Sequence, residues 1–190
     1  PGAPDGDTHE SRLAHELSRE VQGCTVLALH STQSYAEPIA VIDTVDEIAR
    51  SLAPLLPVEI LVETDEHTAG RLIEHAHTIE VECGLQGTED AAANSYLLVL
   101  SFLTATGVLP GVPPARDTPV FRLVRRIPKG PASEYEVFVE NFERVDEGET
   151  YAAVDGESVV AEDQFYPVLM SSSGYEDVFG YAADRVGYVG

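Results

Sequence analysis

Strand-like and helix-like segments alternate along the first 107 residues of this 190-residue chain, and this alternation restricts the fold more than any other feature. Three apolar runs have the composition of buried strands: residues 25–29, 58–62 and 78–83. Beyond a Pro/Gly-rich connector at residues 109–114, short alternating segments such as residues 135–139 are typical of a small all-β unit. We therefore predict an α/β layer sandwich over residues 1–111 and a β-domain over residues 112–190.

Each of the three predicted helices has a recognisable start. Asp7, Thr44 and Thr88 are N-cap residue types, and the first two are followed three residues later by a glutamate, as in a capping box. Gly23 and Gly107 are placed to end the first and the third helix. The third helix carries apolar residues on one face: Tyr96, Val99, Leu100 and Leu103.

Two strand ends carry polar side chains just beyond the carboxyl end of a strand, where α/β sheets place their active sites. His30 follows the run at residues 25–29, which is predicted to be a buried central strand. Glu80 and Glu82 lie two residues apart in the run at residues 78–83, so their side chains point to the same face of a strand. The pattern alone leaves open whether these side chains are functional or ordinary.

The charge of the chain excludes two classes of partner. Its 33 acidic and 11 basic residues give a formal net charge of −22, and Lys129 is the only lysine. Nucleic acids and anionic membranes both need concentrated Lys and Arg, so neither is expected as a partner. The acidic residues are spread along the whole chain, which predicts the solvated surface of a halophilic protein, because high salt screens self-repulsion. Homo-oligomerisation is left open.

The two cysteines do not indicate a disulfide framework, because Cys24 and Cys83 lie far apart and no signal-peptide pattern precedes them. A cytoplasmic location is therefore predicted. A Cys–His nucleophilic pair is conceivable, but both cysteines lie inside apolar strand-like runs, where a small buried residue is the commoner outcome. The chain has no initiator methionine and opens like the middle of a loop, so it is expected to start partway into a larger protein.

The two strand ends resemble the succinylglutamate desuccinylase and aspartoacylase branch of the zinc carboxypeptidase-like hydrolases. In that family a strand ending in Asp-Leu-His, followed by Ser/Asn-Thr, supplies the third zinc ligand, and residues 28–32 match it as Ala-Leu-His-Ser-Thr. A later strand ending in Glu, an apolar residue and Gly supplies the catalytic carboxylate, which matches Glu82-Cys83-Gly84. The resemblance implies a carboxypeptidase-like mixed sheet, zinc as the cofactor, His30 as a zinc ligand and Glu82 as the general base.

The resemblance extends over nearly the whole chain and implies two weaker correspondences. Arg71 lies eleven residues before Glu82, near the place where the family keeps an arginine that grips the substrate. Tyr175 is near a family tyrosine that reaches back towards the substrate carboxylate. Arg71 as an ordinary surface arginine and Tyr175 as a core residue of the β-domain are equally open alternatives.

Two departures from the family pattern bear on activity. The family's Asp before Leu-His is Ala28 here, so another group must orient His30. The family's His-Gly-x-Glu segment, which carries the first two zinc ligands, should precede Pro1. His77 and Glu80 have the same spacing, but residues three apart on a strand face opposite ways. This chain alone is therefore expected to bind zinc poorly and to be inactive.

The function implied for the complete protein is zinc-dependent hydrolysis of the amide of an N-acyl amino acid or a similar small acidic substrate. Local arginines would have to reverse the sign of the surface charge around such a substrate. Two alternatives stay open: a non-catalytic truncated fragment that keeps the fold for binding or assembly, and a related zinc carboxypeptidase-like peptidase.

Overall fold

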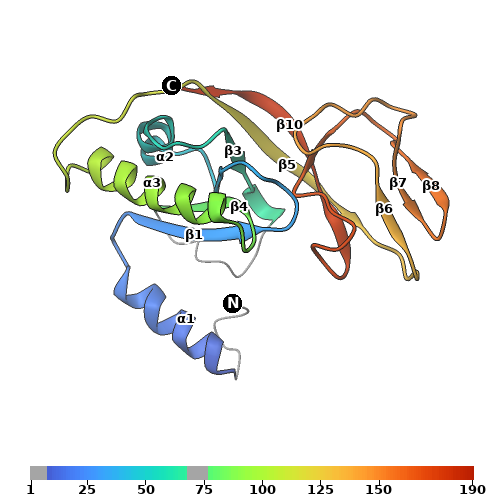
Figure 1. The fold of residues 1–190 in the computed structure, drawn as a ribbon, viewed down its shortest axis with the longest axis horizontal. Helices are drawn as coiled ribbons and strands as arrows, with labels where there is room; N and C mark the ends of the chain where they lie inside the picture. Colours follow the sequence, from blue (N-terminus) through green and yellow to red (C-terminus); the bar gives the residue numbers. More distant parts are fainter. Residues whose placement is uncertain (1–7, 68–76) are drawn as a thin grey trace.

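The computed structural model describes residues 8–67 and 77–190, and Figure 1 shows their arrangement. The helices are α1 (His9–Glu20), α2 (Glu47–Leu52) and α3 (Glu89–Ala105), with short 3-10 turns at Ala53–Leu55 and Asp65–His67. The strands are β1 (Val26–Thr32), β2 (Ile39–Ile42), β3 (Ile60–Glu63), β4 (Thr78–Leu85), β5 (Thr118–Pro128), β6 (Tyr135–Val137), β7 (Thr150–Val154), β8 (Glu157–Val160), β9 (Tyr166–Val168) and β10 (Val178–Val189).

Seven strands form one mixed sheet in the order β1-β4-β2-β3-β5-β10-β9, and β6, β7 and β8 form a separate antiparallel sheet. β1 is parallel to β4, but β4 is antiparallel to β2, and β2, β3 and β5 are parallel to one another. The carboxyl ends of β1 and β4 therefore lie at one end of the sheet, and those of β2 and β3 lie at the other. The predicted α/β layer and the β-rich second part are confirmed.

The helices α2 and α3 cover one face of this sheet, and the main core lies between them. Its buried residues alternate along the strands, as in Ile79, Val81 and Cys83 of β4, and Leu98 of α3 packs against them. α2 begins two residues later than the capping-box pattern predicts. Its N-cap is Asp46, whose Oδ1 accepts a hydrogen bond of 2.7 Å from the backbone N–H of Ala49.

α3 follows the prediction at its N-terminus but not in the face that it buries. Thr88 is the N-cap, and its hydroxyl oxygen accepts a hydrogen bond from the backbone N–H of Ala91. Leu98 is fully buried, whereas Tyr96 is 66% exposed and Leu100 is 36% exposed. The helix is apolar on more than one side, so periodicity alone did not identify the buried stripe.

Two strand predictions need correction. β1 was predicted to be central and buried, but it is an edge strand of the described sheet, and both Leu29 and His30 are exposed. The sequence analysis also missed β2, whose four residues at 39–42 are all buried in the middle of the sheet. A four-residue apolar run is too short to show a period, which explains why β2 escaped prediction.

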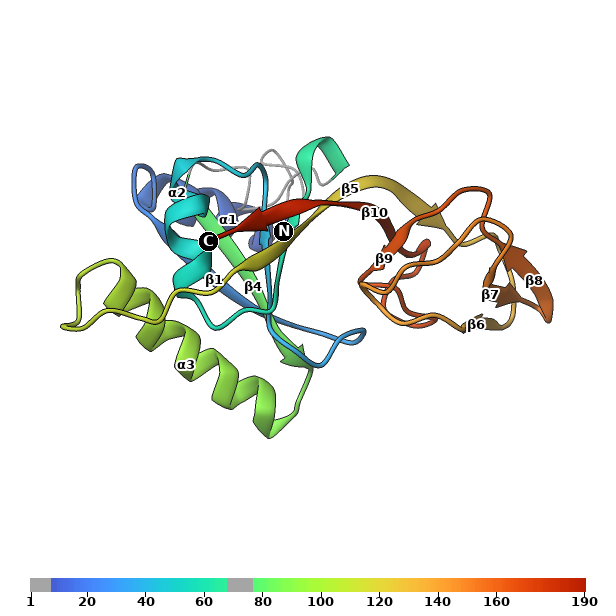
Figure 2. The same ribbon diagram turned by 90° about the horizontal axis from the view of Figure 1, so that it is seen from above.

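The long antiparallel pair β5 and β10 joins the two parts of the molecule, as Figure 2 shows. Val120 near the start of β5 and Val189 at the end of β10 belong to the core under α2 and α3. Ile127 and Phe179, at the other ends of these strands, belong to a separate core with Phe165 of the β-rich part. A domain boundary at residue 112 stays a prediction, since both long strands beyond it also belong to the large sheet.

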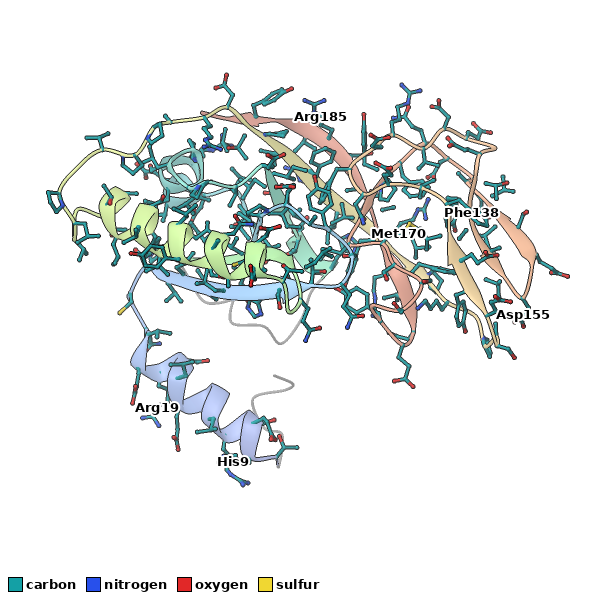
Figure 3. The ribbon with its side chains drawn as sticks, viewed as in Figure 1. His9, Arg19, Phe138, Asp155, Met170 and Arg185 are labelled. Atoms are coloured by element: carbon teal, nitrogen blue, oxygen red, sulfur yellow. The ribbon has the colours of Figure 1, made fainter. Side chains whose placement is uncertain are left out.

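α1 carries polar and charged side chains on its outer surface. His9 and Arg19 extend from this helix away from the sheet in Figure 3, in keeping with the exposed position of both residues. None of the helices in the described ranges is both long and apolar enough to cross a bilayer.

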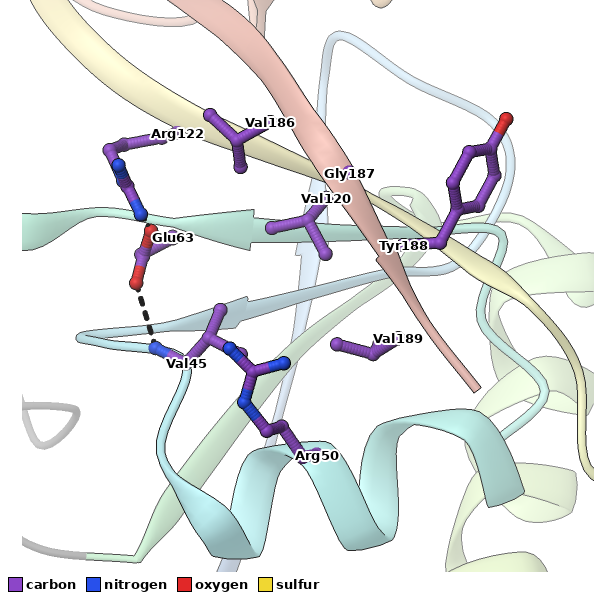
Figure 4. Close-up of a pocket in the computed structure, with 9 residues that line it drawn as sticks. All are labelled: Val45, Arg50, Glu63, Val120, Arg122, Val186, Gly187, Tyr188 and Val189. Atoms are coloured by element: carbon purple, nitrogen blue, oxygen red, sulfur yellow. Dashed lines mark hydrogen bonds and ion pairs between the residues drawn. The ribbon is translucent and has the colours of Figure 1, made fainter.

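A buried carboxylate ties β3 to β5. Glu63 is 6% exposed, and its Oε2 accepts a hydrogen bond of 2.5 Å from Nε of Arg122, its register neighbour. Its Oε1 accepts a second bond of 2.8 Å from the backbone N–H of Val45 (Figure 4). The hydrogen bond and charge of Glu63 raise the pKa of the Arg122 guanidinium, which keeps this arginine charged.

Replacing Arg122 with methionine is expected to lower the free energy of unfolding by about 2 kcal/mol, because the Glu63 carboxylate would stay buried without its cationic partner. The matched control is Arg126→Met. Arg126 pairs with Asp177, but both side chains are more than half exposed, so a loss of about 0.5 kcal/mol or less is expected. Urea denaturation of both variants measures the difference, and equal losses would contradict the role of burial.

Candidate functional site

The structure brings His30 and Glu82 side by side. His30 of β1 and Glu82 of β4 are register partners on parallel strands, which lie about 4.8 Å apart in a sheet. Neighbouring residues of a sheet project to the same face, so both side chains lie on one face near the carboxyl ends of their strands. His30 is exposed and Glu82 is half-buried. This juxtaposition of imidazole and carboxylate is the centre of the candidate site.

The same face carries a second carboxylate one row further into the sheet. Glu80 is 7% exposed and lies between Ala28 and Val41, its register partners on β1 and β2. Glu82, by contrast, lies between His30 and Ile39. Position therefore distinguishes the two glutamates, because Glu82 is the one beside the histidine and nearer to the strand end.

Backbone contacts hold the two strand ends together. The backbone N–H of Gln86, just after β4, donates a hydrogen bond of 2.8 Å to the carbonyl oxygen of Thr32 at the end of β1. Gly84 adopts φ = +125°, and a Cβ at this position would come within 2.6 Å of the carbonyl oxygen of Ala36. Only glycine allows the chain after Glu82 to pass so close to the loop that follows His30.

Asn141 connects this loop to the β-rich part, a contact that was not predicted. Its side-chain amide donates hydrogen bonds to the carbonyl oxygens of Ser34 (2.8 Å) and Met170 (3.2 Å), and its Oδ1 accepts one of 2.7 Å from the N–H of Met170. Asn141 is 107 residues from Ser34 in sequence, so no local signal could have identified the contact. It fixes the position of the loop that begins next to His30.

Aromatic side chains cluster on the face of the sheet that carries Glu82. Tyr35 and Phe142 meet edge to face with ring centroids 5.0 Å apart. Tyr175 packs on Tyr181 at 6.3 Å and belongs to a cluster with Ile39, the neighbour of Glu82. Tyr175 therefore packs in the same cluster as the neighbour of Glu82, and its role towards a substrate stays a prediction. Arg71 lies outside the described residues.

A shallow hollow lies beside His30 at the edge of the sheet. Its lining comes from the end of β1 and the first turns of α3: Leu29, His30, Ser31, Gly87, Thr88, Ala91, Ala92 and Ser95. Glu82 is not part of this lining. The expectation that His30 points into a cleft at a central strand is therefore corrected, because β1 is an edge strand and the hollow beside it is open.

The Cys–His alternative is not favoured by the surroundings of Cys83. This residue is 1% exposed and, by strand alternation, points to the helix-covered face opposite to Glu82. Burial raises the pKa of its thiol, which keeps it protonated and unreactive. Cys24 is exposed and lies before the start of β1, at the opposite end of this strand from His30.

The described residues do not provide a zinc site by themselves. A catalytic zinc needs three protein ligands and one open position. Within residues 8–67 and 77–190, no group of three or more His, Cys, Asp or Glu side chains is arranged to hold a metal ion. Beside His30, the strand pairing supplies only the Glu82 carboxylate. The donor set of the described residues is therefore smaller than zinc requires.

Comparison with known proteins identifies the fold. No family model matches the sequence, and no curated protein matches it either. Solved structures do match, and their fold is the carboxypeptidase-like mixed α/β fold. Mouse aminoacylase 3 aligns with a TM-score of 0.71 and 19% identity over 100% of this chain and 74% of its own.

Two bacterial structures show the same similarity. Succinylglutamate desuccinylase/aspartoacylase from Rhodobacter sphaeroides gives a TM-score of 0.73 and 17% identity over 98% of this chain and 66% of its own. Succinylglutamate desuccinylase from Vibrio cholerae gives 0.69 and 14%, over 97% of this chain and 62% of its own. The predicted fold class, a carboxypeptidase-like mixed sheet followed by a small all-β unit, is confirmed. This chain spans about two thirds of the length of these proteins.

Proposed function

We propose that this chain is the part of an amide-hydrolysing deacylase that carries its general base, and that the substrate is an N-acyl amino acid or a similar small acidic amide. The pairing of His30 with Glu82 at the carboxyl ends of β1 and β4 carries the proposal. The fold supports it, because the matching structures are described as an aminoacylase and as succinylglutamate desuccinylases.

Glu82 has the chemistry and the position for proton transfer. A carboxylate within hydrogen-bonding reach of the attacking water accepts its proton, and the protonated acid then donates that proton to the leaving amine. The half-buried position of Glu82 protects it from bulk water, whereas Glu80 lies deeper among apolar neighbours. Zinc belongs to this proposal as the expected metal, with His30 as one ligand and the other donors outside the described residues.

The substrate class follows from the recognition of carboxylates. Tyr175 and Arg71 are proposed to contact the acidic part of the substrate. Tyr175 would do so from the aromatic cluster that also contains Tyr35 and Phe142. An arginine forms two parallel hydrogen bonds to a carboxylate, which would offset the repulsion from a protein of net charge −22. The protein is also proposed to be cytoplasmic and adapted to high salt.

The test is hydrolysis by the complete gene product at high salt with added zinc. N-succinylglutamate and N-acetylaspartate should be hydrolysed. An N-acetylated amino acid with an uncharged side chain should be hydrolysed at least about tenfold more slowly, since it offers fewer carboxylates for contacts. Faster cleavage of unacylated peptides would instead identify a peptidase of the same fold.

The incomplete donor set favours a second candidate, a non-catalytic protein that keeps the fold for binding. The two candidates differ in their affinity for metal. A complete gene product that binds no zinc in calorimetric titration and hydrolyses none of these amides would support the binding protein and contradict the deacylase.

A further inference from the structure

The loop at residues 33–38 crosses the strand that carries Glu82. It begins where β1, the strand of His30, ends, and it leads into β2, the other neighbour of β4. Since β4 lies between β1 and β2 in the sheet, the loop crosses β4 near its carboxyl end. The close approach of Gly84 to the carbonyl oxygen of Ala36 marks this crossing. The loop therefore forms a rim of the face that carries His30 and Glu82.

Two consecutive residues of the β-rich part contact this loop. The side-chain amide of Asn141 donates its hydrogen bond of 2.8 Å to the carbonyl oxygen of Ser34. The ring of Phe142 meets the ring of Tyr35 edge to face. In Figure 2 the loop, drawn in blue after β1, projects towards the β-rich part. Its middle is thus held by a segment that lies more than 100 positions away in sequence.

The Asn141 amide is itself held in one orientation by its own part of the chain. Its Oδ1 accepts a bond of 2.7 Å from the backbone N–H of Met170, and its Nδ2 donates one of 3.2 Å to the carbonyl oxygen of Met170. The next backbone N–H, of Phe142, donates a bond of 2.8 Å to the carbonyl oxygen of Pro167. Only one N–H direction of the amide is left, and it points to Ser34.

Backbone strain flanks both ends of this contact. Phe142, next to Asn141, has φ = +68°, and Leu169, next to Met170, has φ = +51°. Bulky residues rarely adopt these values, and they keep them only where the surrounding structure enforces them. Gly180 of β10 supports Met170 from behind, since a Cβ there would lie 2.7 Å from the Cα of Met170. Strain of this kind concentrates at functional sites, which indicates that the placement of Asn141 serves more than packing.

We propose that Asn141 is a positioning residue that holds the loop at 33–38 across β4, and that the loop in turn contacts the bound substrate. The proposal rests on the function proposed above, because it places the substrate on the face beside His30 and Glu82. Strand pairing, and not the loop, keeps those two residues in register. Release of the loop is therefore expected to weaken substrate binding and to leave the reacting groups in place.

Backbone hydrogen exchange in the complete gene product tests the hold on the loop independently of activity. In Asn141→Ala, exchange in residues 33–37 should be at least about tenfold faster, because local opening of the loop breaks one contact fewer. Asn141→Asp should show the same increase. Its carboxylate can still accept the bond from Met170, which preserves the fold, but it cannot donate one to Ser34.

Arg122→Met is the control for a general loss of stability. It removes the ion pair with Glu63, which joins β3 to β5 and not the loop to the β-rich part. Exchange in residues 33–37 should stay within about twofold of wild type in this variant, because local opening of the loop does not break that ion pair.

Steady-state hydrolysis of N-succinylglutamate measures the effect on the substrate. Asn141→Ala should raise KM at least about tenfold and leave kcat within about threefold of wild type, a split that a general loss of stability would not produce. The matched control is Asp155→Ala. Oδ1 of Asp155 also accepts two backbone hydrogen bonds, from Ser133 and Glu134, but both lie within the β-rich part, so KM and kcat should not change.

Each measurement has a result that overturns the proposal. Wild-type exchange of the loop in both Asn141 variants, or an equal increase in Arg122→Met, would show that Asn141 does not hold the loop. A fall in kcat at unchanged KM would contradict the role in substrate binding. If the wild type hydrolyses none of the amides, the proposed function fails, and the exchange comparison still decides whether Asn141 holds the loop.

Discussion

Replacing Glu82 with glutamine is expected to lower turnover of the complete enzyme about 100- to 10,000-fold, the usual contribution of a general base. Glutamine keeps the size and shape of the side chain but cannot accept the proton of the attacking water. The substrate affinity should change much less, because the lost interaction matters mainly in the transition state. Steady-state hydrolysis of N-succinylglutamate by wild type and variant measures both quantities.

The control for this prediction is Glu80→Gln, on the same strand and the same face. Glu80 lies one row away from His30, between Ala28 and Val41, so this change should leave turnover within a few fold of wild type. The opposite result, with turnover lost in Glu80→Gln and kept in Glu82→Gln, would transfer the proton-transfer role to Glu80. Retention of turnover in both variants would contradict the assignment of a carboxylate base to β4.

The second large effect is expected from Gly84→Ala, which should lower the free energy of unfolding by roughly 3 to 5 kcal/mol. Alanine disfavours the backbone conformation at φ = +125°, and its Cβ would overlap the carbonyl oxygen of Ala36 at 2.6 Å. Because that oxygen belongs to the backbone, relief requires the loop after β1 to move. The displacement would also disturb the alignment of His30 with Glu82.

Gly87→Ala separates the steric effect from the conformational one. Gly87 also has a positive φ of +80°, but a Cβ there would meet no atom within 4 Å. Only the conformational cost remains, so a loss of about 1 kcal/mol is expected. Urea denaturation of the two variants provides the comparison, and similar losses would show that the close approach to Ala36 is not what requires glycine at position 84.

The fold could be predicted where local signals were strong and failed where they were weak. Thr88 was identified correctly as an N-cap, because a hydroxyl before a long apolar helix is a specific signal. Thr44 was predicted as the N-cap of α2, but Asp46, another residue of an N-cap type two positions later, takes that place. β2 was missed altogether, since its position in the middle of the sheet depends on partners from both neighbouring strands.

The sequence by itself determined the residue types of the candidate site and their places at the ends of two strands. His30 and Glu82 were singled out because the residues around each resemble the motifs of a known family, although 52 positions separate the two. Their adjacency was decided by the tertiary structure, because the pairing of β1 with β4 skips over β2 and β3. The same holds for Asn141, whose hydrogen-bond partner Ser34 lies in a distant segment. Strand order depends on which apolar faces bury one another, and that is a property of the whole chain and not of any local pattern.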